Sequence, residues 1–248
     1  MKKVSFPLSL SCLLGSFLLL PVVKAGEVDK QINSAVVKSA SVATSSFAAV
    51  EAAALSLYNN LNLESMGLNP QALINAYKGH QKLVEEGKVP QDDILTVCDF
   101  SQPSDRKRMY IIDMENEKVL VNTYVAHGKN SGLQRAERFS NRHESLQSSL
   151  GFYVTKGTYF GKHGLSLKLN GMERGYNDNA ESRAVVVHGA NYIGENRLGA
   201  AYMGRSFGCP AVPQAQANKI INLIKNGTTL FIYSPNQQYL HGSRILNG

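Results

Sequence analysis

Cysteine is scarce in this chain, with three among 248 residues, and Cys12 lies inside an apolar run near the start. Close pairs such as Cys-x-x-Cys or His-x-x-x-His, which zinc sites usually show, are absent. A glycine-rich phosphate loop is also missing, which argues against a nucleotide enzyme. The sequence therefore predicts no cofactor. A metal held by Cys209 and strand-end histidines is the alternative.

The chain has no segment in which charges of one sign are concentrated. The formal net charge is +7, and it falls to +4 without the first 25 residues, whose three lysines have no acidic counterpart. No stripe of lysine and arginine interleaved with aromatic residues is present, so nucleic acid is not an expected partner. A mildly basic protein of this kind suits a polyanionic cell envelope.

Residues 1–25 have the order of a secretory signal peptide. Lys2 and Lys3 precede the apolar run Leu8–Leu20, and Val23-Lys24-Ala25 places small residues near a cleavage position. The run is short for a bilayer span, although an uncleaved anchor is the alternative. We therefore expect a periplasmic or secreted protein, associated with the cell envelope and without a stable membrane span after cleavage.

Helical spacing appears first in the chain beyond that signal. Residues 26–45 resemble a flexible lead-in, and apolar residues from Phe47 to Leu61 then recur at helical intervals. Asn69-Pro70 resembles the start of a second helix, and Gly87 can end it. We expect residues 26–92 to form the lead-in and a helical hairpin.

Short strands dominate the next part of the chain, residues 93–234. Their number and spacing predict a mainly β domain, a sandwich or barrel, with one helix after Cys209 that has Pro213 in its first turn. Residues 235–248 are expected to form a loosely ordered tail. The expected strands are 94–100, 109–113, 119–126, 151–155, 164–169, 184–187 and 228–233.

Cys209 lies where a reactive thiol would be expected. Gly208 permits a sharp backbone turn, in which the amide groups of Gly208 and Cys209 can point into one pocket and form an oxyanion hole. The positive end of the following helix would favour the thiolate form of Cys209. Cys98 instead lies in a strand pattern, as a buried cysteine does. A disulfide between Cys98 and Cys209 is the structural alternative.

The base for such a thiol would be a histidine, and four His-Gly pairs compete for the role. His188 follows the buried-looking strand 184–187 and precedes Cys209 by 21 positions, so one loop can join them. His163 lies between glycine-rich turns and would line the cleft. His127 begins a polar loop and His241 lies in the tail. The remaining two, His80 on a helix and His143 in a loop, are expected at the surface.

His188-Gly189 followed by Ser206-Phe207-Gly208-Cys209 resembles the signature of the L,D-transpeptidases. Further similarity to the murein L,D-transpeptidase catalytic domain family extends over residues 93–234. Two positions depart from commoner members, because Phe207 stands where many carry a second histidine and Pro210-Ala211 follows the cysteine. The other resembling segments are 140–141, 148–151, 159–164, 175–180 and 204–205.

The resemblance implies a peptidoglycan enzyme with Cys209 as nucleophile and His188 as base. It implies that the Gly189 carbonyl fixes the tautomer of His188, and that Cys209 cleaves a tetrapeptide stem and passes it to a neighbouring stem in a 3→3 cross-link. Donor and acceptor stems are the expected partners, and carbapenems the expected inhibitors. Arg205 is expected to contact the substrate or support the site, although its sequence context fits a surface position equally well. The other expected substrate-contacting or supporting residues are Ser206, His163, Tyr159 and Asn177.

Three alternatives remain open from the sequence. A hydrolase, either an L,D-carboxypeptidase or an endopeptidase, would use the same residues with water as acceptor. A wall-binding protein with a vestigial site is argued against by the intact His188 and Cys209. A sortase-like enzyme would require an arginine in a strand after the cysteine, where this chain has only Arg244 in the tail.

Overall fold

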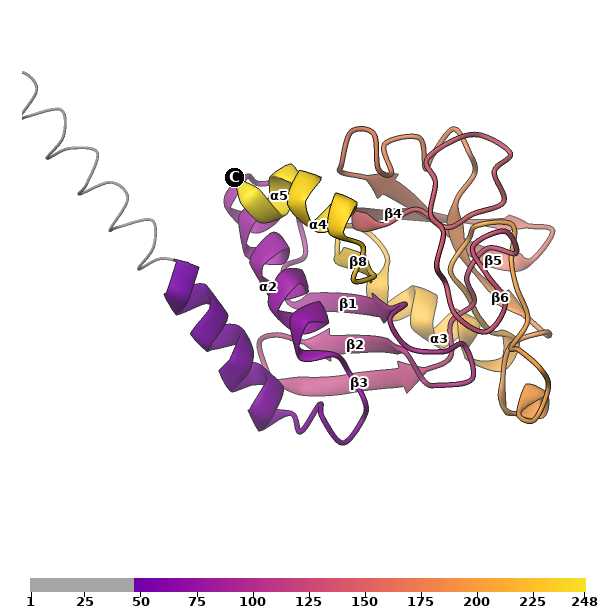
Figure 1. Ribbon diagram of the computed structural model, residues 1–248, viewed down its shortest axis with the longest axis horizontal. Coiled ribbons are helices and arrows are strands. Elements are labelled where there is room, and N and C mark those ends of the chain that lie inside the picture. Colours follow the sequence, from indigo (N-terminus) through magenta and orange to yellow (C-terminus); the bar gives the residue numbers. More distant parts are fainter. Residues whose placement is uncertain (1–46) are drawn as a thin grey trace, which may run out of the picture. The chain divides into compact units, whose positions relative to one another are not determined.

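The computed structural model describes residues 47–248, so the expected signal peptide and lead-in lie outside the described residues. Within them, eight strands form one sheet in the order β3-β2-β1-β8-β4-β5-β6-β7 (Figure 1). The result confirms the mainly β prediction. The strands are β1 (Ile94–Asp99), β2 (Met109–Asp113), β3 (Lys118–Thr123), β4 (Gly151–Gly161), β5 (Gly164–Gly171), β6 (Val186–Ala190), β7 (Ala211–Pro213) and β8 (Thr229–Tyr233).

The sheet is mixed and curls towards closure. Strand β8 runs parallel to β1, and β7 runs parallel to β6, whereas the remaining neighbours are antiparallel. Ala126, three residues beyond β3, donates its amide to the Ala211 carbonyl of β7 at 2.8 Å. One edge of the sheet thus meets the other, which gives the barrel-like character expected from the many short strands.

Two helices precede the sheet, as the apolar spacing predicted. The first covers residues 47–60, and the second is α2 (Pro70–Glu85). The Asn69 side chain accepts the Gln71 amide at 2.9 Å, and the left-handed Gly87, with φ +65°, follows the helix end. No helix among residues 47–248 is both long and apolar enough to cross a membrane.

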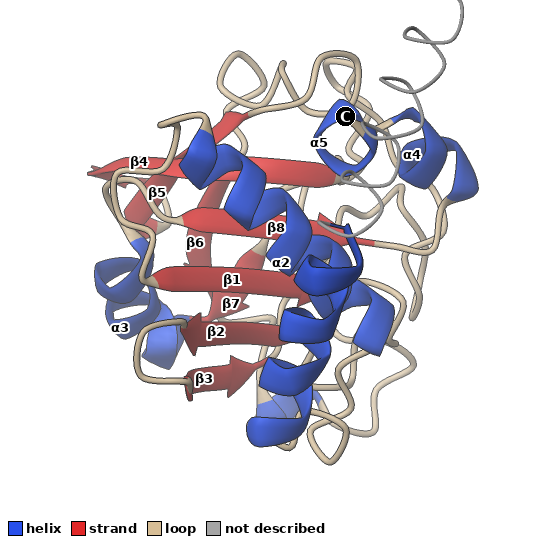
Figure 2. Cartoon of the chain, turned by 90° about the vertical axis from the view of Figure 1, so that its left-hand side faces the viewer, coloured by secondary structure: helices blue, strands red, loops and turns tan. Residues whose placement is uncertain are grey.

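Helix α2 crosses one face of the sheet, in front of β1 and β8 in Figure 2. Every residue of β1 and β8 is buried, as expected for strands covered on both faces. The fit is tight at Gly79, because a Cβ atom there would lie 2.0 Å from the Phe152 ring on β4. The core thus joins the N-terminal helices to the sheet.

Helix α3 (Gln214–Ile224) packs against β5 and β6 through its buried residues Ala217, Ile220, Ile221 and Ile224. The helix predicted after Cys209 is present, but strand β7, which was not predicted, lies between the cysteine and its start. Pro213 also precedes the helix as its N-cap. A helix dipole acts mainly within its terminal turn, so α3 is not the main source of stabilisation for a Cys209 thiolate.

The C-terminal tail is helical, contrary to the loosely ordered segment expected. It forms α4 (Gln237–Gly242) and α5 (Arg244–Asn247), and it buries Tyr239, Ile245 and Leu246. The buried carboxylate of Glu173 accepts hydrogen bonds from the hydroxyls of Tyr239, at 2.8 Å, and Ser243. The tail is therefore tied to the β domain through Glu173.

Removing this carboxylate is expected to destabilise the whole fold. Glu173 also accepts the Phe152 amide at 2.9 Å, so Glu173→Ala leaves three buried donors without their partner. We expect a loss of about 2–4 kcal/mol in urea unfolding. Tyr239→Phe removes one donor only and should cost about 1 kcal/mol. Equal stability of Glu173→Ala and the wild-type protein would contradict the anchoring role.

Candidate active site

Strands β6 and β7 bring the expected nucleophile and base to one region of the sheet. In their parallel pairing, His188 lies opposite Ala211, so Cys209, two residues earlier, aligns with Val186. The Cys209 thiol donates to the Ala184 carbonyl, with sulfur and oxygen 3.7 Å apart. The thiol therefore lies beside the segment that leads into β6, the strand that carries His188.

His188 is held in one orientation by its neighbour. Its Nδ1 atom lies 2.9 Å from the Gly189 carbonyl oxygen, which is the contact expected from the resemblance. Only a protonated Nδ1 can donate there, so the neutral ring carries its free lone pair on Nε2. Burial is the main cause that lowers the pKa of His188, while the Gly189 contact raises it and the nearby His163 lowers it further. The ring is thus suited to accept a proton.

Gly189 is required for packing as well as for this contact. A Cβ atom at Gly189 would lie 2.7 Å from the Gln214 side chain and 2.8 Å from Ala217 of α3. Any other residue would push α3 away from β6 and disturb the strand that carries His188.

The loop before β7 is a tight turn around Ser206. The Ser206 hydroxyl donates to the Cys209 carbonyl at 2.6 Å and accepts the Gly208 amide at 3.0 Å. Gly208 adopts φ +128°, a conformation that side chains rarely allow, as expected for the residue before the cysteine. Its amide is already bonded, so the expected pair of free oxyanion donors is not present in this state.

The electrostatic surroundings of Cys209 include a residue that the sequence analysis missed. Burial raises the pKa of the Cys209 thiol, and the Val186 amide and the Arg183 guanidinium oppose that rise. Arg183 donates to the carbonyls of Ser140, at 2.9 Å, and Gln147, at 2.8 Å. It therefore fixes the adjacent loop and supplies a positive charge near the thiol. Its sequence context, Glu-Ser-Arg-Ala, carries no signal for this role.

Most of the expected supporting residues hold structure together. Arg205 donates to the carbonyls of Lys129, at 2.8 Å, and Gly132, at 3.1 Å, and so steadies the loop of Cys209. Asn177 is fully buried and uses its amide on the carbonyls of Leu150 and Phe152. Asn177 is consequently a supporting residue rather than a substrate contact.

The histidines occupy different environments. His163 is exposed, and its ring stacks on that of His188 with centroids 4.2 Å apart. His127 is buried, and Arg108 donates to its Nδ1 atom at 2.8 Å. The expectation that His80 lies at the surface was wrong, since it is buried against Thr229. The polar character of His80 favoured a surface position, but the face of α2 that carries it packs on the sheet.

Cys98 and Cys209 are both free, so the disulfide alternative does not describe this structure. Cys98 lies on β1 and is fully buried, as its strand pattern predicted. Burial raises its pKa to about 12, which keeps this thiol protonated near neutral pH. Cys209 is partly exposed and therefore the accessible thiol of the pair.

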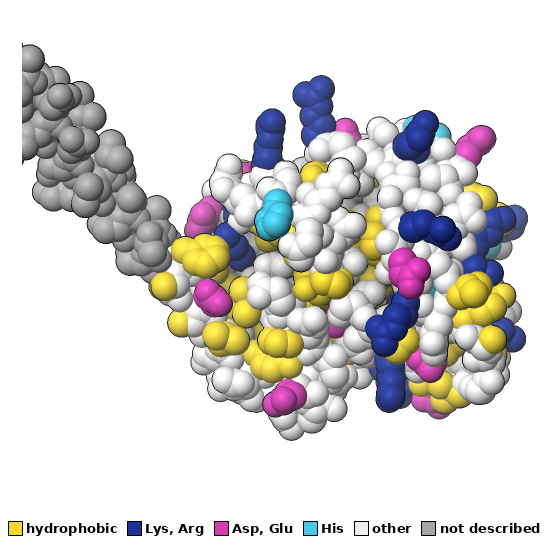
Figure 3. Space-filling model, viewed as in Figure 1, with side chains coloured by type: hydrophobic (Ala, Val, Ile, Leu, Met, Phe, Trp, Pro, Cys, Tyr) yellow, Lys and Arg dark blue, Asp and Glu magenta, His cyan; other side chains and the backbone are white. Residues whose placement is uncertain are grey.

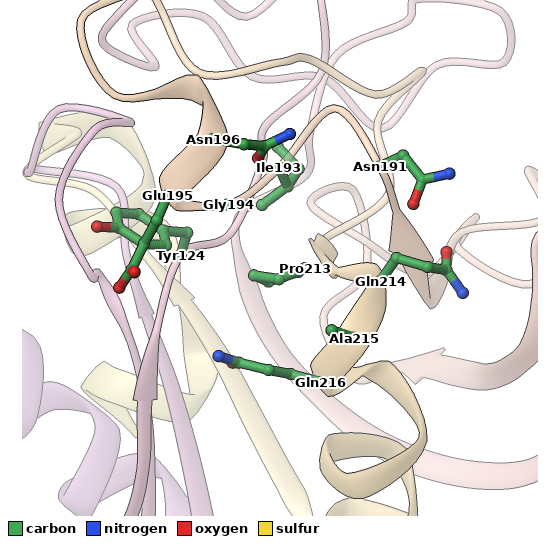
Figure 4. Close-up of a pocket in the computed structure, with 10 residues that line it drawn as sticks. All are labelled: Tyr124, Asn191, Ile193, Gly194, Glu195, Asn196, Pro213, Gln214, Ala215 and Gln216. Carbon is green, nitrogen blue, oxygen red and sulfur yellow. The ribbon is translucent and has the colours of Figure 1, made fainter.

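Two cavities lie near this region. One of about 140 Å³ adjoins the Cys209 sulfur through Ala184 and Val186 and is lined further by Tyr159, Lys168 and Glu181. A larger one of about 350 Å³ lies where β6 ends and α3 begins (Figure 4). Neither lining includes Cys209 or His188, but the smaller cavity is lined by Ala184, whose carbonyl accepts a hydrogen bond from the Cys209 thiol, so it is the better candidate for a bound acyl donor. The labelled side chains of the larger cavity are mostly polar: Tyr124, Asn191, Glu195, Asn196, Gln214 and Gln216.

A family model, described as the L,D-transpeptidase catalytic domain, matches residues 64–233 and includes both His188 and Cys209. The chain belongs to this family. Membership confirms the resemblance and the L,D-transpeptidase enzyme class expected from the sequence. It does not by itself assign the role of each residue in the site.

Solved L,D-transpeptidase structures are more distant. One from Mycobacterium smegmatis has 13% identity and a TM-score of 0.35, with 57% of this chain and 59% of that chain covered. One from Stackebrandtia nassauensis has 14% identity and a TM-score of 0.34, with coverages of 67% and 68%. This chain thus spans less than two thirds of the length of the mycobacterial protein. No curated protein matches the chain.

Proposed function

We propose that this L,D-transpeptidase domain is exported and transfers peptidoglycan stem peptides through a thioester on Cys209. One observation carries the proposal. The partly exposed Cys209 lies two residues before Ala211 of β7, which pairs with His188 of β6, and the Nδ1 atom of His188 is committed to the Gly189 carbonyl. A nucleophile with an oriented base nearby is the arrangement that acyl transfer requires.

In the proposed first step, His188 Nε2 takes the proton of the Cys209 thiol. The sulfur attacks the amide carbonyl carbon after the third residue of a tetrapeptide stem and forms a tetrahedral oxyanion. We assign the Cys209 amide as a donor to that oxygen, because the Gly208 amide is bonded to the Ser206 hydroxyl. Collapse of the intermediate breaks the carbon–nitrogen bond, and the leaving D-alanine amine takes the proton from His188. The thioester remains on Cys209.

In the second step, the side-chain amine of a neighbouring stem attacks the thioester carbonyl. Its proton passes to His188 and then to the departing sulfur, which restores the thiol. The product is a 3→3 cross-link. If water attacks instead, the same residues give a hydrolase.

The charge of the chain supports a cell-wall location. Most lysine and arginine side chains visible in Figure 3 lie on the half of the molecule that carries β4, β5 and β6. Such a surface favours a polyanionic wall. The signal-like order of residues 1–25 supports export, and an exported protein that retained those residues would contradict cleavage.

Mass spectrometry of purified disaccharide-tetrapeptides incubated with the mature protein tests the reaction. A transpeptidase gives a dimer that has lost one D-alanine. A hydrolase gives tripeptides and free D-alanine, which would replace the transfer proposal. Unchanged substrate with the wild-type protein would contradict both readings of the site.

Carbapenems are expected to acylate Cys209. The strained lactam presents an amide carbonyl like that of the stem. When the Cys209 sulfur attacks it, the ring opens and a thioester forms, and the amine that is released stays attached to the acyl group. Intact-mass measurement should show one adduct on the wild-type protein and none on Cys209→Ser. An adduct on Cys209→Ser would show that another residue reacts.

A further inference from the structure

The β4–β5 hairpin brings a second imidazole to His188. Gly161 pairs with Gly164 at the end of the hairpin, so His163 lies in its turn. Strand β5 then pairs with β6, with Ser166 opposite His188. The rings of His163 and His188 are stacked, with centroids 4.2 Å apart and planes inclined by 23°. The stack joins an exposed hairpin turn to a buried strand.

No imidazole approaches His188 from the cysteine loop itself. The residue between Ser206 and Gly208 is Phe207, which is 69% exposed and lies under the Lys129 amine. The face of β6 at Gly189 meets Gln214 and Ala217 of α3, and neither carries a charge. Within residues 47–248, His163 is therefore the ring stacked on His188.

The other ionisable groups of the region cluster around the thiol. Cys209 lies in the loop before β7, Arg183 precedes β6, and Tyr192 follows it. Both Arg183 and Tyr192 lie close enough to Cys209 for its charge to affect their pKa values. Lys168 of β5 lines the small cavity beside the sulfur. Strand β7, Ala-Val-Pro, contributes no ionisable side chain.

We infer that His163 is a positioning residue for the reaction, which stacks on His188 and fixes the orientation of its ring. This inference rests on the proposed role of His188 as the base. The two ring centroids lie 4.2 Å apart, so a positive charge on His163 opposes protonation of His188.

The direction of the pKa shift agrees with this geometry. Burial is the larger cause that lowers the pKa of His188, and repulsion from His163 lowers it further. An imidazole with a lowered pKa remains neutral, and so able to act as a base, down to a lower pH. Loss of the His163 charge should therefore raise the pKa of His188 and narrow the pH range in which it acts as a base.

The test compares three variants of the mature protein by following the titration of the His188 ring by NMR. His163→Phe keeps an aromatic ring on His188 but removes the charge, and His163→Ala removes both. His241→Ala removes an exposed histidine on α4 and is the matched control. We expect the His188 midpoint to rise by about one pH unit in His163→Phe and to stay unchanged in His241→Ala.

Kinetics then separate charge from orientation. His163→Phe should keep its plateau kcat within about threefold while the acid limb of kcat/KM moves to higher pH, and His163→Ala should also lose about tenfold in plateau kcat. An unmoved His188 midpoint in His163→Phe would overturn the inference. The NMR titration requires no turnover. It therefore still tests whether His163 affects His188 if the wild-type protein forms no acyl-enzyme and the proposed function fails.

Discussion

Cys209→Ser is expected to form no thioester and to lose transfer activity by a factor on the order of 10⁴ or more. A serine hydroxyl is far harder to ionise than a thiol. A neighbouring imidazole that can deprotonate the thiol does not make up for this difference in acidity. The turn itself should survive, because the Ser206 hydroxyl bonds to the backbone of Cys209 and Gly208 rather than to the sulfur. Intact-mass measurement with a tetrapeptide donor gives the readout.

Cys98→Ser is the matched control for this substitution. Cys98 is fully buried on β1, and its raised pKa keeps the thiol protonated, so it has no nucleophilic role to lose. Activity should be retained, while the buried hydroxyl should cost about 1–3 kcal/mol of stability. An inactive but folded Cys98→Ser together with an active Cys209→Ser would reverse the assignment of the nucleophile.

Local patterns predicted the elements whose signals are contained within one segment. Asn69-Pro70 started α2 and Gly87 followed its end, because capping needs only neighbouring residues. The short run of apolar residues at Met109–Asp113 was predicted as a strand with both of its bounds correct. The contact between His188 and Gly189 was likewise foreseeable, since it joins adjacent residues.

Features that depend on distant pairing were not predictable in the same way. Strand β7 has three residues, too few for any period to show, and it exists because Ala211 pairs with both His188 and Ala126. Helices α4 and α5 are short and gain order by covering Glu173 and the α2 face. Neither feature has a strong signal of its own.

The site follows the same division. Cys209 and His188 could be proposed from the sequence because each lies in a distinctive local context, and their catalytic roles stay a prediction. Arg183 and the His163 stack were missed or left as cleft residues, because their roles arise from loops and hairpins that pack together across the fold. The helix dipole was assigned too large a role, since the short strand between Cys209 and α3 was not visible in the sequence.

His188→Ala is expected to lower transfer by a factor on the order of 10²–10⁴, the usual cost of losing a general base. His188 Nε2 is the free ring nitrogen, since Nδ1 donates to Gly189. In the wild-type protein the pKa of His188 lies below its ordinary 6.5, so activity that needs the neutral ring should fall only below that pH. The acid limb of kcat/KM should disappear in the variant.

The same substitution should change the thiol itself. Burial raises the pKa of Cys209, and without an imidazole to share its proton the thiol should react with iodoacetamide only at higher pH than in the wild-type protein. His241→Ala is the clean control, whereas His127→Ala is not, because buried His127 accepts a hydrogen bond from Arg108 and its loss disturbs the core. A His188→Ala protein with wild-type transfer and an unshifted iodoacetamide profile would show that the base is another residue.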